Sequence, residues 1–174
     1  VLTYAVRVGP RFERAETAGI SHFLEHMLHR GTTRLPTAHD QAVAVESLGC
    51  TLDAVTGVDH GTLSLTAPPE SFEAAAELLG EITTAPRFSD IDVERGIVRE
   101  ELLEDVDDRG KLVDPDGIVR GMLFGDHPLG YPIIGTRRTL ASFDEAMLRR
   151  HHARHYTARS AVVVAAGRLP SPAK

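Results

Sequence analysis

Cysteine and tryptophan are nearly absent from this chain, which has one cysteine, Cys50, and no tryptophan in 174 residues. A single cysteine excludes an internal disulfide and a zinc site built from cysteines. No apolar run approaches the roughly 20 residues that a membrane-spanning helix needs, so we expect no membrane association.

Basic residues are outnumbered: 19 lysines and arginines face 25 acidic residues, giving a formal charge of −6. A nucleic-acid surface needs a basic patch, and the arginines that are adjacent in the sequence fall in two separate pairs without an aromatic platform. We therefore expect solvated arginines and no nucleic-acid partner. The pairs are Arg137 with Arg138 and Arg149 with Arg150.

The chain opens on "VLTYAVRVG", without an initiator Met, a basic segment or a cleavage site. We expect a trimmed or processed start and a soluble protein, or a soluble piece of one, with the cytoplasm favoured over the periplasm. A hydrophobic content of 42% in 174 residues suits one domain, predicted over residues 1–168 with a tail at 169–174.

Hydrophobic periodicity and turn residues predict a strand, two helices, a hairpin, several helices and a final strand. A hairpin within the sheet makes it mixed or antiparallel, so the fold class is α+β with helices packed on the sheet. We expect Thr17 or Ser21 to cap the first helix, which would stop at Gly31. Strands are predicted at 1–9, 50–57, 59–68 and, as a buried strand, 160–167; helices follow Thr17 or Ser21 and span 37–49, 70–86, 89–108, 114–125 and 142–156.

The stretch "SHFLEHMLHRGT", residues 21–32, carries three histidines and a glutamate on one helical face. At 100° per residue His22, Glu25, His26 and His29 fall within an arc of about 100°, opposite an apolar side. This face could simply point to water, but solvated faces usually carry lysine, glutamate and arginine. His22 and His26, four residues apart, can chelate one ion, and Glu25 could then take a proton from a water that zinc activates.

A catalytic zinc normally takes three protein ligands, so a third is expected elsewhere. His29 lies about 10 Å from His22 along the helix axis, too far to share a small ion. In the acidic helix Glu94 and Glu101 nearly coincide on the wheel at an apolar boundary, where each should have a metal or an arginine as partner. Glu101 is thus a candidate ligand, an ordinary salt-bridged face is the alternative, and Asp105 is a weaker rival.

"HFLEHMLHRGT", followed by Glu101 in "ERGIVREELLED", resembles the M16 family of zinc metallopeptidases, whose motif is the inverted H-x-x-E-H. The hairpin "GCTLDAVTGVDHGTLSLTAP", the loop "HPLGYPIIGT" and the segment "RHYTARSAVVVAAG" are also similar to that family, and the processing-peptidase-like branch looks closest. The resemblance implies a two-layer LuxS/MPP-like metallohydrolase domain with helices on one face of a mixed or antiparallel sheet.

Carried over residue by residue, the resemblance implies that His22, His26 and Glu101 bind one zinc ion per chain. Glu25 would be the general base, and Glu94 would support the ligands from behind. The expected reaction is hydrolysis of peptides or unfolded protein segments by a zinc metalloendopeptidase.

The resemblance also implies that the substrate lies extended along an edge strand, here the strand with Asp53, Ala54, Val55 and Thr56. An edge strand offers unpaired backbone groups to an extended peptide, although this could equally be an ordinary strand. The family builds its chamber from at least two homologous domains. We therefore expect this chain to be a fragment, or one half of a homo- or heterodimer, completed by a second M16-type domain.

Two other functions compete with hydrolysis. One is a non-hydrolytic M16-like subunit that binds peptide or supports an active partner, and the other is a zinc protein acting on a small molecule. The complete ligand set argues against the first, because a retired subunit is expected to lose Glu25 or a histidine.

The remaining histidines are expected to be structural or solvated. His151 and His155, with His152 between them, have no carboxylate on their face, so we predict an exposed helix there. His127 precedes a proline and is predicted to be structural. His39 and His60 are predicted to lie at the surface.

Overall fold

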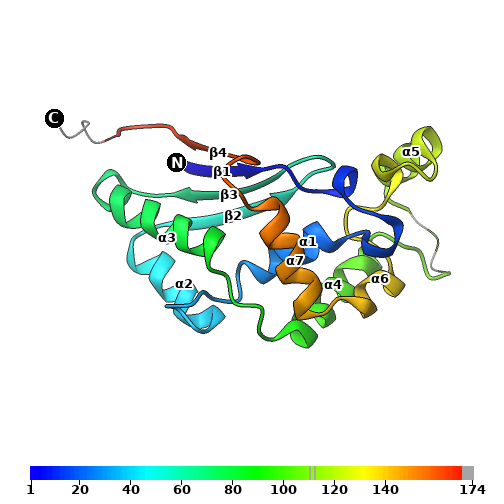
Figure 1. The fold of residues 1–174 in the computed structure, drawn as a ribbon, viewed down its shortest axis with the longest axis horizontal. Helices are drawn as coiled ribbons and strands as arrows, with labels where there is room; N and C mark the ends of the chain where they lie inside the picture. The colour runs from blue at the N-terminus through cyan, green and yellow to red at the C-terminus, as the bar shows by residue number, and fades with distance from the viewer. Residues whose placement is uncertain (110, 112, 170–174) are drawn as a thin grey trace.

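The structure, a computed structural model, describes residues 1–109, 111 and 113–169. Of the predicted tail, the part from residue 170 onward lies outside the described residues. Figure 1 shows a sheet with the larger helices gathered on one side of it. In chain order the elements are β1 (Leu2–Val6), α1 (Ile20–Met27), α2 (Ala38–Ser47), β2 (Thr51–Thr56), β3 (Gly61–Thr66), α3 (Phe72–Thr84), α4 (Ile91–Glu104), α5 (Pro115–Phe124), α6 (Arg137–Ser142), α7 (Glu145–His155) and β4 (Ala161–Ala165), with short 3-10 turns between some of them.

The sheet has the strand order β2-β3-β1-β4, and every neighbouring pair is antiparallel. The register places Leu2 opposite Leu65, and Leu65 opposite Leu52, on the face that the helices cover. Thr3 and Ser64 pair on the opposite face. The predicted α+β fold is confirmed, and β2, the strand of the predicted peptide contacts, is an edge strand.

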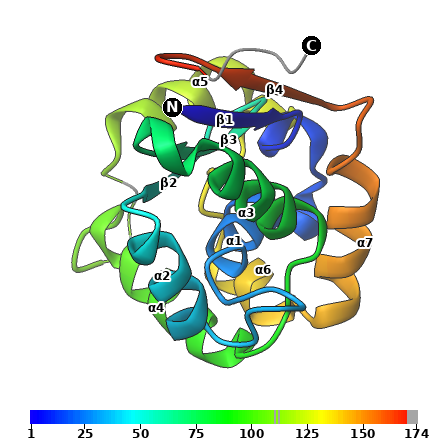
Figure 2. The ribbon, with the colours of Figure 1, turned by 90° about the vertical axis from the view of Figure 1, so that its left-hand side faces the viewer.

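Two groups of buried side chains form the core, and α1 contributes to both. One lies between the sheet and α3 and includes Leu28 at the end of α1. The other, among α1, α4, α6 and α7, includes Phe23, Leu24 and Met27, each 0% exposed. Figure 2 shows α1 in the middle of the other helices. Burial of this apolar side turns the histidine side of α1 toward α4 and β2.

The predicted boundaries of the first helix were wrong. Gly19, with a φ of 92°, precedes α1, and neither Thr17 nor Ser21 caps it. The helix ends at Met27, short of the predicted stop at Gly31. Glu13, distant from the expected cap, supplies the carboxylate that accepts from the first backbone amides.

The final strand, predicted to be buried, is an exposed edge strand. β4 pairs with β1 alone among the described strands, and Val162, Val163 and Val164 are 62%, 65% and 50% exposed. A run of three valines is typical of a strand covered on both faces, but within the described part of the chain β4 is at the border of the sheet. The short helix α6, which begins after the cap Thr136, was not predicted.

The helix α7 is not exposed along its histidines, contrary to prediction. Its histidine face packs inward: His151 Nε2 lies 3.1 Å from Ser21 Oγ, and His152 Nε2 lies 2.8 Å from the carbonyl oxygen of Thr83. His155 is 9% exposed and contacts the carbonyl of Arg7. The prediction was wrong because it took the lack of a carboxylate on this face as a sign of exposure. These imidazoles pair with a hydroxyl and with backbone carbonyls instead.

The other predictions for isolated histidines were confirmed. His127 is structural, since its Nδ1 accepts from the amide of Leu129, while His39 and His60 are exposed. Among the helices of the described residues, none combines the length and the apolar character needed to cross a membrane.

The burial of His151 predicts a specific dependence of stability on pH. Burial, and then the nearby charges of His155 and Arg154, lower the pKa of His151 from 6.5 to about 3. In the unfolded chain His151 binds a proton near pH 6.5, whereas in the folded chain it does so only near pH 3. The free energy of unfolding therefore falls as pH drops between these values. In urea titrations from pH 7 to 5, His151→Gln should lose less stability than the unmodified chain. Parallel losses would contradict this account.

Candidate metal centre

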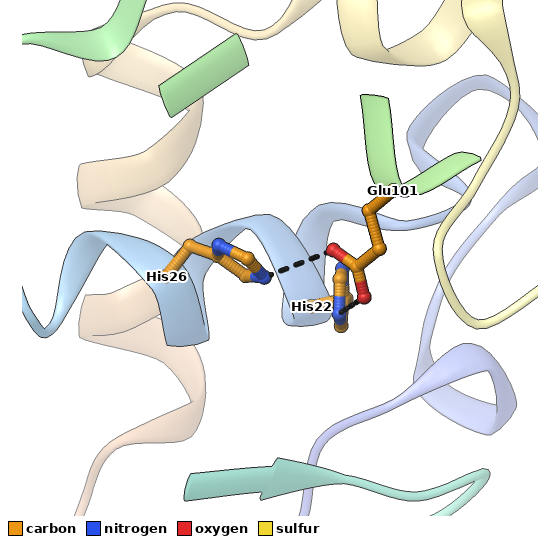
Figure 3. A group of neighbouring side chains, drawn as sticks. All are labelled: His22, His26 and Glu101. Atoms are coloured by element: carbon orange, nitrogen blue, oxygen red, sulfur yellow. Dashed lines mark ion pairs between the residues drawn. The ribbon is translucent and has the colours of Figure 1, made fainter. Parts of the chain in front are cut away.

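Two imidazoles and one carboxylate converge between α1 and α4. His22 and His26 lie one turn apart on α1, and Glu101 reaches them from α4, as Figure 3 shows. His22 Nε2 is 3.4 Å from Glu101 Oε1, and His26 Nε2 is 3.3 Å from Glu101 Oε2. In the described part of the chain this is the group of three potential ligands whose donor atoms all lie within 4.8 Å of one another.

The trio fits a zinc ion. With metal–ligand distances of about 2.1 Å, neighbouring ligand atoms of a tetrahedral zinc lie about 3.4 Å apart. The separations of 3.4 and 3.3 Å, each to a different oxygen of Glu101, are close to that value, and all three ligand atoms lie within 4.8 Å of one another. Glu101 Oε2 is buried without a hydrogen-bond partner among the described residues, as expected of an oxygen reserved for another ligand. Two imidazoles and a carboxylate also leave a fourth position open, as in catalytic zinc sites.

Glu94 holds His26 from behind. Its Oε1 lies 2.7 Å from His26 Nδ1, and its other oxygen accepts from Arg30 Nε. Glu94 is 4% exposed, so these two partners compensate its burial. A carboxylate on Nδ1 fixes the tautomer that leaves Nε2 free to bind a metal. Glu94 was predicted to have a metal or an arginine as its partner, and its partners are a histidine and an arginine.

The electrostatics between these carboxylates favour a cation. Burial opposes a positive charge on His26, but the nearby carboxylates of Glu101 and Glu94 outweigh it and raise the pKa of His26 to about 9. The imidazoles of His22 and His26, 3.4 and 3.3 Å from its oxygens, hold the pKa of Glu101 well below its ordinary value. Burial tends to raise the pKa of Glu94, but hydrogen bonds from His26 and Arg30 lower it overall. Two ionised carboxylates therefore face the imidazoles.

Glu25 lies on the same side of α1, between the two histidines, and is half-buried. Its Oε2 accepts a hydrogen bond from the hydroxyl of Thr56, the last residue of β2. The general-base candidate is thereby tied to the end of the edge strand. Sequence analysis assigned Thr56 to peptide binding and gave no sign of this bond.

Two cavities follow β2 and meet at Glu25. The first, of about 760 Å³, is lined by Glu25, His26 and the first half of β2, including Asp53. The second, of about 810 Å³, is lined by Glu25, His22 and Glu101 together with Ala54, Val55 and Thr56. The four predicted peptide-binding residues are thus divided between the two cavities.

The remaining ligand candidates lie beside the trio. His29 lines the first cavity and Asp105 the second, and neither belongs to the group of three. Burial lowers the pKa of His29, which favours its neutral form. Arg30 was missed; it lies just beyond the end of α1, four residues after His26.

The model of the insulinase family, peptidase family M16, matches residues 2–137. The chain belongs to peptidase family M16. The predicted resemblance is confirmed by this match and by relatives that are named zinc proteases. An uncharacterized zinc protease of Mycobacterium leprae is 35% identical over 167 residues, which cover 94% of this chain and 37% of that protein.

Solved structures show the same M16 fold. The peptidase M16 inactive domain from Pseudomonas fluorescens matches with a TM-score of 0.82 at 20% identity, covering 93% of this chain and 39% of that one. The first half of the periplasmic protease PqqL from Escherichia coli matches with a TM-score of 0.79 at 23% identity, covering 93% and 36%. The M16 chain thus spans little more than a third of the proteins that it resembles.

The buried contacts of Glu94 predict a large effect on stability. Glu94→Ala leaves Arg30 and His26 without their partner, and we expect a loss of about 3 kcal/mol in the free energy of unfolding in chelator. Asp92→Ala is the matched control, because Asp92 pairs with Arg95 on the same helix while its side chain is 93% exposed. The loss for Asp92→Ala should stay below about 1 kcal/mol. Equal losses in urea titrations would show that the Glu94 contacts add nothing.

Proposed function

We propose that this chain is the zinc-binding catalytic domain of an M16 metalloendopeptidase that hydrolyses peptides or unfolded protein segments. One observation carries the proposal: the potential ligands and Glu25 open into cavities that run along an unpaired strand edge. A metal-dependent peptidase needs metal ligands, a base and a way to hold an extended chain, and residues suited to all three lie together here.

His22, His26 and Glu101 would hold one zinc ion. When bound, zinc supplies a Lewis acid that polarises a peptide carbonyl and acidifies water to a pKa of about 7. Glu94 keeps His26 in the tautomer that binds metal, and Arg30 neutralises the second oxygen of Glu94.

Glu25 would act as the general base. Its carboxylate would remove a proton from the attacking water and deliver that proton to the leaving amine. The hydroxyl of Thr56 occupies Oε2 of this carboxylate, which fixes its orientation and leaves Oε1 to the water. No covalent intermediate with the protein is required.

The substrate would lie along β2, where Asp53, Ala54, Val55 and Thr56 offer backbone groups to an extended peptide. Because the two cavities meet at Glu25, a peptide on this edge would place residues on both sides of the base. The second cavity also contains Glu104, Asp105 and Asp116, so that half favours positively charged peptide segments.

A second M16-type domain or subunit would complete the chamber. This chain covers 36% of a structure described as the first half of a protease, which supports a division of labour between homologous domains. A measurement of mass in solution distinguishes two domains joined in one chain from two subunits that associate as a dimer.

The competing proposal is a non-hydrolytic M16 subunit that binds peptide. The similarity to a domain named inactive favours it. The complete trio and Glu25 oppose it, since a subunit without catalysis has no need of a base directed into the same cavities.

The test is Glu25→Gln, with Glu101→Ala as the variant that removes a ligand. The first should retain about one zinc per chain while peptide hydrolysis falls about 10²- to 10⁴-fold, the usual contribution of a general base. The second should lose zinc. Zinc is measured by atomic emission, and hydrolysis is assayed for this chain alone and with any M16-type domain that accompanies it.

The outcomes separate the proposals. Undiminished hydrolysis by Glu25→Gln would exclude Glu25 as the base. Zinc binding without hydrolysis by the unmodified protein, together with peptide binding that Glu25→Gln leaves intact, would favour the non-hydrolytic subunit.

The bond between Thr56 and Glu25 predicts a second effect on catalysis. Thr56→Val keeps the shape of the side chain and its preference for a strand but frees the carboxylate of Glu25 to rotate. We expect kcat to fall about tenfold, the loss of one hydrogen bond of about 1.5 kcal/mol, with KM and zinc content unchanged. Thr56→Ser should restore kcat, and Thr66→Val on β3 serves as the control. A rise in KM alone would assign Thr56 to substrate binding.

A further inference from the structure

The start of α1 is held by a carboxylate outside the helix. Glu13 is 5% exposed, and its two oxygens accept from two backbone amides at the start of the helix: Oε2 from the amide of Gly19 at 2.7 Å and Oε1 from the amide of Ser21 at 2.9 Å. Among the described residues Glu13 forms no ion pair with a lysine or arginine within 4.0 Å. The positive end of α1 is therefore its principal partner.

Burying the carboxylate of Glu13 without a cationic partner among the described residues costs free energy, so a compensating role is expected. Burial raises the pKa of Glu13 against the hydrogen bonds from Ser21 and Gly19 that lower it, and a buried carboxylate lacking a cation is rare. A serine or aspartate at the helix start is the ordinary solution. Glu13 instead reaches the helix from a separate turn.

The ordinary solution is blocked by the packing around Gly19. Gly19 has a φ of 92°, and a Cβ on it would lie 2.6 Å from the carbonyl oxygen of Ile134 and 2.5 Å from Cα of Gly135. No side chain fits at the capping position. The backbone amides that begin α1 must then be satisfied from elsewhere, and Glu13 does so.

Ser21 ties the same point to two further segments. Its Oγ accepts from the amide of Gly9 at 2.9 Å and lies 3.1 Å from His151 Nε2 on α7. Ser21 immediately precedes His22. The helix is thus fixed from three directions at the residue before the first potential ligand.

We infer that Glu13 is a positioning residue for the metal centre: it sets the axial position and rotation of α1, and so directs His22, Glu25 and His26 toward Glu101 and β2. This rests on the proposed zinc site. α1 has only eight residues, and a slip of one residue moves a side chain by about 1.5 Å along the axis and 100° around it. Ligand separations of 3.3 and 3.4 Å do not survive such a slip.

Glu13→Gln tests the inference, because an amide of the same shape keeps one acceptor and turns a donor toward the other backbone amide. We expect the zinc dissociation constant to rise about tenfold, as when groups that orient ligands are removed. The visible absorption of the cobalt(II)-substituted protein should change, since it reports ligand geometry. Amide exchange in α1 of the metal-free protein should accelerate.

Glu81→Gln is the matched control. Glu81 is also a little-exposed carboxylate, with a side chain 8% exposed, but it binds Thr32 and Arg34 away from the start of α1. It should lower stability while leaving the zinc dissociation constant, the cobalt spectrum and α1 exchange as in the unmodified chain. Equal zinc affinity and equal spectra for Glu13→Gln and the unmodified chain would overturn the inference.

The remaining outcomes are also decisive. If Glu13→Gln does not fold, Glu13→Asp replaces it: the charge remains but the reach is shorter, and unchanged zinc affinity and α1 exchange would overturn the role. If the unmodified chain binds no zinc, the proposed function fails, and the α1 exchange rates of Glu13→Gln alone decide whether Glu13 positions this helix.

Discussion

Burial of the apolar side of α1 is the constraint on which the candidate site depends. Phe23, Leu24 and Met27 have no exposed surface, so the helix cannot rotate without removing them from the core. The cost of exposing three such side chains is on the order of 6 kcal/mol. Packing thus sets which side of α1 carries His22 and His26, and the role inferred for Glu13 is to set the axial position and the fine rotation of the helix within that limit.

Three carboxylates, two of them buried and that of Glu101 partly exposed, then complete the positioning that packing begins. Glu13 secures the start of α1, Glu94 secures the imidazole of His26, and Glu101 faces both histidines from α4. Each is paired with a different kind of donor: backbone amides, a histidine with an arginine, and the two imidazoles. The pKa values of Glu94 and Glu101 are lowered by these partners, so both carboxylates favour the ionised form that a cation site requires.

The antiparallel sheet connects this centre to a surface that a peptide can reach. β2 is at the edge because the chain returns through β3 to the centre of the sheet and adds β4 on the far side. Its last residue, Thr56, is on the face that turns toward α1 and bonds to Glu25. The proposed base and the proposed binding edge are therefore parts of one hydrogen-bonded unit.

Periodicity in the sequence was sufficient for the α+β class, the hairpin at 51–66 and the placement of His22 and His26 on one helical face, because the spacing of side chains on a helix follows from its 3.6-residue period alone. It left Glu101 as one candidate among several, and the resemblance to the M16 family singled Glu101 out as the third ligand. Other features of the structure depend on contacts between separate elements, which periodicity does not specify. The inward face of His151 depends on Ser21, 130 residues away in the chain, and the exposure of the β4 valines depends on the position of β4 at the border of the sheet, beside β1. Glu13 is only six and eight residues from the amides of Gly19 and Ser21, but it reaches them through an irregular turn that has no period. Helical and strand periods do not specify which segments pack together, so only the packed structure determines these contacts.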